Sequence, residues 1–92
     1  MSRAAMHPGR ILQEEYLEPM GITAGELARA IHLPEHTVYD LVHAQQRCTG
    51  DFAIRLSKAL KTQPQFWLGL QNHWDLQTAA SSVLTEEILS LV

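Results

Sequence analysis

Apolar residues recur along the chain at spacings of three and four, the period of helices with one buried face. No alternating apolar and polar stretch reaches the length of a strand, so the pattern predicts an all-α protein. Turn residues divide the pattern into five helices joined by loops of roughly two to five residues, which is typical of a compact bundle.

Capping residues and prolines set the helix boundaries. The first helix is predicted to open at Pro8 and to end at Pro19 and Gly21. Thr23 followed three residues later by Glu26 is a capping-box pattern and opens the second helix. The other three helices open near Pro34, Thr49 and Pro64. The side chains predicted to face the core from helices two to four are Leu27, Ala28, Ile31, Val38, Leu41, Val42, Phe52, Leu56, Ala59 and Leu60, and an apolar stripe on the fifth helix consists of Phe66, Trp67, Leu70 and Trp74.

The window 23–42 fits a helix-turn-helix better than an ordinary antiparallel helix pair. The crossing of its two helices needs a small residue at their contact, which Ala28 supplies, and inward aliphatics on the second helix, which Val38 and Leu41 supply. His32 occupies the turn position that glycine commonly holds for its left-handed backbone, at a cost of about 1 kcal/mol. We therefore expect a helix-turn-helix domain over residues 1–77.

Residues 78–92 are predicted to form a small-residue linker and a short final helix. Leu84, Ile88, Leu91 and Val92 would share one face of that helix. A short apolar helix at a chain end needs a surface to pack on. It packs either on its own core or on a partner. The candidate dimer or partner contacts are Trp67, Trp74, Leu84, Ile88 and Leu91.

The charge distribution limits the choice of partner. The net charge is −3. All seven Lys and Arg residues lie within residues 1–61, and seven acidic residues in the same segment balance their charge. The acidic remainder of the chain suits a basic protein partner better than DNA. A single cysteine, Cys48, fits a reducing compartment, and no stretch approaches the length of a membrane span or signal peptide, so a cytoplasmic protein is expected.

Several segments resemble the HigA/VapI-type antitoxins of the Xre/Cro-like repressor superfamily. They are HPGRIL (7–12), EPMGI (18–22), LARA (27–30), AIRLSKAL (53–60) and PQFWLGLQN (64–72). The resemblance covers residues 7–76 and implies a five-helix, lambda-repressor-like bundle. It also implies a homodimer that represses its own operon and neutralises a small, basic, RelE/HigB-like toxin that cleaves messenger RNA.

Transferred position by position, the superfamily pattern implies a DNA-facing surface on the second and third helices and the loop after them. Its residues are Thr23, Ala24, Pro34, Glu35, His36, Thr37, Tyr39, Asp40, Gln45, Gln46 and Arg47. The third helix carries no Lys or Arg, and residues 43–47 read His-Ala-Gln-Gln-Arg where relatives commonly have Asn-Gly-Lys-Arg. Each lost phosphate contact weakens binding. We expect operator binding weaker than in a typical relative and tightened by the toxin.

Other functions have less support in the sequence. His36, Asp40 and His43 share a helical face with metal-ligand residue types, but a solvated DNA-facing surface explains them better. No nucleophile and base are paired, so neither an enzyme nor a cofactor is expected. A protein-interaction module that no longer reads DNA remains an alternative. The toxin is expected to contact acids of the first helix, or the fifth helix and the tail; those acids are Glu14, Glu15 and Glu18.

Overall fold

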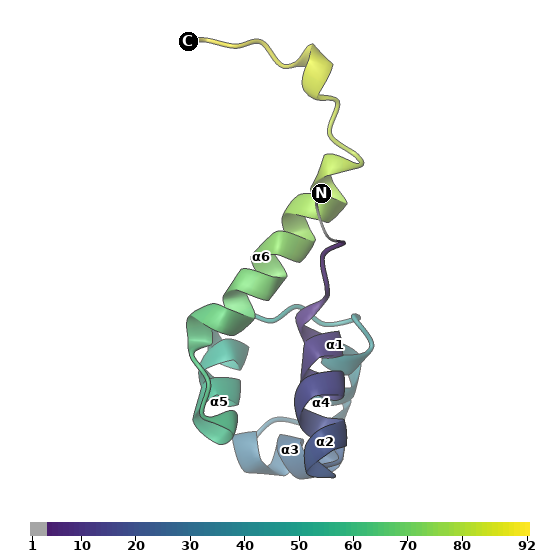
Figure 1. Ribbon diagram of the computed structural model, residues 1–92, viewed down its shortest axis with the longest axis vertical. Helices are drawn as coiled ribbons and strands as arrows, with labels where there is room; N and C mark the ends of the chain where they lie inside the picture. The colour runs from purple at the N-terminus through teal and green to yellow at the C-terminus, as the bar shows by residue number, and fades with distance from the viewer. Residues whose placement is uncertain (1–3) are drawn as a thin grey trace.

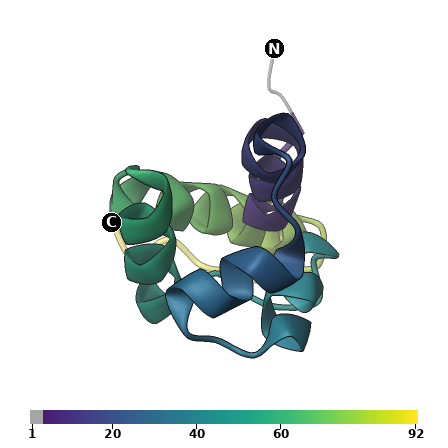
Figure 2. The same ribbon diagram turned by 90° about the horizontal axis from the view of Figure 1, so that it is seen from below.

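The computed structural model describes residues 4–92, and within that range it contains helices and no strand. A first helix runs without a break through α1 (Pro8–Ile11), η1 (Leu12–Leu17) and α2 (Glu18–Met20). It is followed by α3 (Ala24–Ile31), α4 (Glu35–Val42), α5 (Gly50–Leu60), α6 (Pro64–Ala80) and a single 3₁₀ turn, η2 (Thr85–Glu87). Five helices form the bundle, as predicted (Figure 1). Figure 2 shows the first helix and α5 on opposite sides of α3.

The first helix passes through Pro19 instead of ending there, so that predicted boundary is wrong. In a regular α-helix, a proline loses one hydrogen bond and collides with the carbonyl four residues earlier. Residues Leu12–Leu17 form a wider π-helix, in which the Glu18 N–H donates to the Gln13 carbonyl. The wider turn accommodates the proline ring. Gly21, at φ 66°, then ends the helix as predicted.

The core lies where the first helix, α3, α4 and α5 meet the start of α6. Its buried residues are Leu12, Leu17, Leu27, Ala28, Ile31, Val38, Leu41, Cys48, Phe52, Ala53, Leu56 and Trp67. One predicted core residue differs, because Ala59 is exposed, and Phe66 of the apolar stripe on α6 is exposed as well. Burial raises the pKa of the Cys48 thiol to about 11, which makes it an inert packing residue.

Trp67 belongs to this core and not to a contact surface, so its prediction as a dimer or toxin contact is wrong. Its side chain is 0% exposed and its indole Nε1–H donates to Thr62 Oγ1 over 2.7 Å. Tyr16 and Phe66 pack against its ring. The spacing of apolar residues along the helix identified Trp67 as an apolar position, but it could not show whether the side chain faces the core or a partner.

The end of the chain departs from the prediction in two ways. Thr78, Ala79 and Ala80 continue α6 instead of forming a linker, and residues 83–92 form η2 and extended chain instead of a helix. Every residue from 81 to 92 is exposed, and Figure 1 shows this tail leaving the far end of α6, away from the bundle. The tail does not pack on its own core because no surface of that core lies beside it. No helix among residues 4–92 has the length and apolarity needed to cross a bilayer.

Candidate nucleic-acid interface

The α3–turn–α4 unit has the packing of a helix-turn-helix. Ala28 is buried at the helix contact, and Val38 and Leu41 are both 0% exposed. His32 ends α3 in the left-handed conformation at φ 59°, as predicted for the turn. The first helix approaches α4 so closely at Gly9 that a side chain there would overlap the Leu41 carbonyl oxygen. This contact helps to hold α4 in place.

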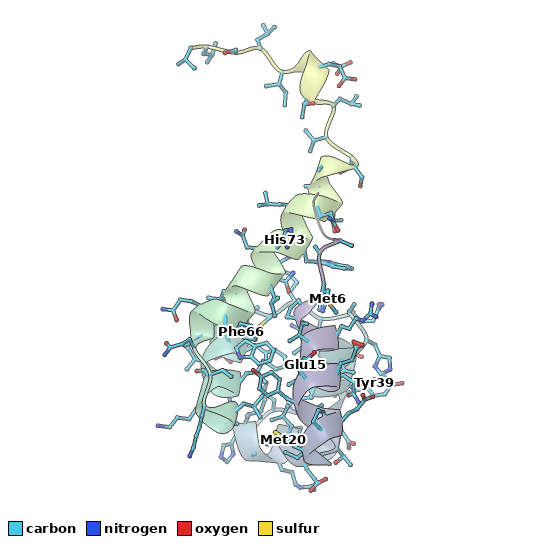
Figure 3. The ribbon with its side chains drawn as sticks, viewed as in Figure 1. Met6, Glu15, Met20, Tyr39, Phe66 and His73 are labelled. Atoms are coloured by element: carbon cyan, nitrogen blue, oxygen red, sulfur yellow. The ribbon has the colours of Figure 1, made fainter. Side chains whose placement is uncertain are left out.

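The predicted DNA-facing residues of α4 lie on its outer side. Pro34, Glu35, His36 and Tyr39 are exposed, whereas Thr37 and Asp40 are partly buried. Figure 3 shows the Tyr39 side chain projecting from α4 away from the bundle. An exposed first turn on the second helix of such a unit is the part that enters a major groove.

The N-terminus of α3 is more occupied than the sequence indicated. The Thr23 N–H donates to Glu26 Oε1 over 3.0 Å, and Thr23 Oγ1 accepts from the Glu26 N–H over 3.1 Å, which confirms the capping box. The hydrogen bond from the Thr23 backbone lowers the pKa of the Glu26 carboxyl. The Thr23 amide is thereby committed to a carboxylate, and Ala24, half-buried behind it, offers no polar side chain.

Glu35 folds back toward α3. Its Oε1 atom lies 2.9 Å from the position that a Cβ on Gly25 would take. Gly25 therefore makes room for the Glu35 carboxylate against the first turn of α3. The role of this glycine has no signal in the sequence, because it depends on the crossing of two helices.

The C-terminal end of α4 stacks Tyr39 on His43. Their ring centroids are 4.1 Å apart, and His43 Nδ1–H donates to the Tyr39 carbonyl over 2.8 Å. Ala44 follows at φ 59°, in the left-handed region where relatives are expected to carry glycine. Gln45 and Gln46 then lead away from the helix, the first exposed and the second partly buried.

Arg47, the predicted phosphate partner, is bound to a residue that the sequence analysis missed. Its Nη1 and Nη2 atoms donate to the two carboxylate oxygens of Asp75 on α6, over 2.9 and 2.8 Å. Gln71 Nε2 also donates to Asp75, and Gln71 Oε1 accepts from the Cys48 N–H. The bonds from Arg47 and Gln71 lower the pKa of the Asp75 carboxyl, and Asp75 raises the pKa of Arg47. Two polar residues four apart on an otherwise uncharged helix were the available signal.

His7 is a second residue whose role sequence reasoning missed. It is buried, its Nδ1 accepts from the Gly9 N–H over 3.0 Å, and its ring meets Trp74 edge-on at 5.2 Å. Burial lowers the pKa of His7, with a smaller opposing effect of Asp75. The neutral imidazole therefore caps α1 and fixes Trp74, which is half-buried. Among residues 4–92, no group of three or more His, Cys, Asp or Glu side chains is arranged to hold a metal ion.

Similar proteins agree on the nature of this fold. No family model matches the chain. Virulence-associated protein I of Dichelobacter nodosus is 43% identical over 75 residues, which are 82% of this chain and 69% of that protein. Antitoxin HigA-1 of Vibrio cholerae is 40% identical over 74 residues, 80% of this chain and 70% of that protein.

Solved structures extend the similarity to nearly the whole chain. The antitoxin HigA of Pseudomonas aeruginosa, determined with the higBA promoter, superposes with a TM-score of 0.90 and 37% identity, over 97% of this chain and 100% of that one. Sequence and structure thus lead to the same assignment: the chain belongs to the HigA family of Xre-like helix-turn-helix antitoxins.

Proposed function

We propose that the protein is an antitoxin that represses its own operon by binding operator DNA as a symmetric dimer, with α4 in the major groove. The observation that carries this proposal is the exposed outer face of α4 on an intact helix-turn-helix. The HigA relative solved with its promoter supports it. In this proposal His36 bonds a base edge, Tyr39 reaches a phosphate, and Arg47 reaches a phosphate by leaving Asp75.

Neutralisation of a RelE/HigB-like messenger-RNA-cleaving toxin by complex formation is the second half of the proposal. Family membership supports it. Exposed acids offer complementary charge to a basic partner on the first helix, at Glu15 and Glu18, and on the tail, at Glu86 and Glu87. Glu14 is already paired with Arg10 and is a weaker candidate.

The outer face of α6 is suited to pairing with a second copy. Phe66, Gly69, His73 and Leu76 lie at helical spacing and are all exposed. The only charged residue of this helix, Asp75, is bound to Arg47. Two copies of such a face can approach without like charges opposing each other, and nothing stands within 4 Å of a Cβ built on Gly69.

A mobility-shift titration with the DNA upstream of the gene tests operator binding. We expect His36→Ala to weaken the shift by about tenfold or more, since a lost base contact costs about 1–3 kcal/mol, and Arg47→Ala to weaken it on every DNA sequence, since a phosphate contact is lost. Lys61→Ala, at the far end of α5, is the matched control and should bind like the unchanged protein. Equal binding by all four proteins would refute the assigned interface.

A protein-interaction module with weakened or lost DNA binding is the second candidate. The observations that favour it are the acids Glu35 and Asp40 on α4 and the engagement of Arg47 by Asp75. It predicts that His36→Ala and Arg47→Ala leave operon expression unchanged while co-expression still rescues cells from the toxin. Our main proposal predicts derepression with rescue intact, and nanomolar operator binding without toxin would contradict the expected weak affinity.

A further inference from the structure

An apolar groove lies between the end of α3 and the outer side of α5. It has a volume of about 560 Å³ and is lined by Ala30, His32, Ile54, Arg55, Lys58 and Ala59, among others. The side chain of Ile54 is 62% exposed at this groove, on the side of α5 opposite to its buried face. A large aliphatic side chain in a groove with no covering element marks a surface that another chain segment can cover.

The rim of the groove is cationic. Arg55 donates to the Ile31 carbonyl over 2.6 Å and to Asp51 Oδ1 over 2.6 Å, so its guanidinium is held against the end of α3. Lys58, one turn further along α5, is exposed and has no ion-pair partner among residues 4–92. The groove therefore combines an apolar floor with one free positive charge.

The C-terminal tail, residues 81–92, has the complementary chemistry. Leu84, Ile88 and Leu91 are 58%, 65% and 95% exposed. Glu86 and Glu87 lie between them and have no ion-pair partner in the described part of the chain. Nucleic acid would meet the cations but gain nothing from the apolar floor, and a basic protein would be repelled by Lys58.

We infer that this groove receives the C-terminal tail of a second copy of the chain. The inference rests on the proposed dimer. The tail leaves one end of α6, whereas α5, which lines the groove, lies beside its other end (Figure 1). Antiparallel pairing of two α6 helices, each about 25 Å long, brings the tail of one copy beside α5 of its partner. Twelve extended residues span at most about 40 Å, which is enough to cross the groove.

The experiment uses a labelled peptide of residues 81–92 and the protein ending at Ala80. No residue of the tail is buried, and the core lies between Leu12 and Trp67, so the shortened chain keeps its fold. Fluorescence anisotropy should show saturable binding. Ile54→Asp should weaken binding by about tenfold or more, as expected for the loss of an apolar anchor. Met20→Asp, at an aliphatic residue 55% exposed elsewhere, is the matched control and should bind normally.

Charge reversal tests the register of the ion pairs. Lys58→Glu should weaken binding, and a peptide with Glu86→Lys and Glu87→Lys should restore it. No saturable binding, or equal binding by the Ile54→Asp and Met20→Asp proteins, would overturn the inference. The inference would also be overturned if the shortened protein binds the peptide while the full-length protein stays monomeric at all concentrations. In that case the groove would hold the tail of its own chain.

Failure of the wider proposal is separately visible. Peptide binding requires no DNA, so a chain that captures the peptide yet shifts no operator fragment refutes operator binding and supports the groove assignment. A chain that shifts the operator but fails to bind the peptide refutes only the groove assignment.

Discussion

At Gly9, the addition of a single methyl group is expected to lower the free energy of unfolding substantially. A methyl group there would overlap the Leu41 carbonyl, and backbone on both sides leaves no flexible side chain to move aside. We predict that Gly9→Ala lowers the free energy of unfolding by at least about 2 kcal/mol, within the range for overpacked cores. Urea unfolding followed by circular dichroism measures it.

Gly50 provides the control for that substitution. No atom lies within 4 Å of a Cβ built there, and its φ is not in the left-handed region. Gly50→Ala should leave stability unchanged or raise it by up to about 1 kcal/mol, through the lower entropy of the unfolded chain. Equal losses at both glycines would argue against the close approach of α1 and α4.

Ala44 holds a backbone conformation that suits glycine. At φ 59° its Cβ carries a steric penalty of about 1 kcal/mol. We predict that Ala44→Gly raises stability by about 0.5–1 kcal/mol and increases the thermal midpoint by several degrees. Ala30→Gly, exposed within α3, should instead lower it. A loss in both variants, seen by differential scanning calorimetry, would contradict the assigned loop conformation.

His7 makes stability depend on pH. Because burial lowers its pKa in the folded chain, the unfolded chain binds its proton first as the pH falls. The stabilisation is complete above the unfolded value near 6.5 and is lost as the pH falls toward the lower folded value. We predict that the free energy of unfolding declines below about pH 7, and that His7→Asn, which keeps a capping side chain, removes most of the decline.

Asp75 contributes to the pH dependence of stability in a lower pH range than His7. Its pKa is also lowered, so its stabilisation is likewise lost on acidification, but below its ordinary value of 3.8. Urea titrations between pH 5 and 8 therefore report on His7 alone of these two groups. An unchanged slope in His7→Asn would contradict the assignment of this pH dependence to His7.

At the scale of elements, an ion pair joins the α4–α5 loop to α6, and it holds the cation that we propose reaches a DNA phosphate. Asp75 holds both terminal nitrogens of Arg47. We predict that Asp75→Asn tightens DNA binding, because Arg47 then reaches its phosphate without first leaving a carboxylate, and that the salt dependence keeps its slope, because the number of phosphate contacts is unchanged. Mobility shifts at several salt concentrations measure the slope.

The double variant is the control for this link. Combining Asp75→Asn with Arg47→Ala should abolish the gain, since the released cation is then absent. A gain that persists without Arg47 would mean that removal of the Asp75 charge acts on DNA directly.

At the scale of the whole molecule, we expect the tail to contribute to dimerisation and not to the stability of the fold. Truncation after Ala80 removes no buried residue. We predict that it leaves the helical signal of residues 4–80 intact but converts the proposed dimer to a monomer, as measured by sedimentation equilibrium. A full-length chain with Leu84, Ile88 and Leu91 changed to Ser should behave in the same way. An unchanged dimer in both would remove the tail from the interface.

The sequence alone determined the features that depend on neighbouring residues. The capping box joins Thr23 to Glu26, three positions apart, and apolar spacing within one helix identified Val38 and Leu41. The left-handed turn at His32 was likewise predictable from the motif around it. These interactions form within one or two helical turns, so a linear pattern contains all the information they need.

Tertiary structure alone decided the features that join distant segments. Arg47 and Asp75 are 28 positions apart, and only the angle between the loop and α6 brings a predicted phosphate partner onto a carboxylate. Trp67 became core instead of surface for the same reason. The tail failed to form its predicted helix because a short apolar segment folds only against a surface, and the chain's own core offers none beside it.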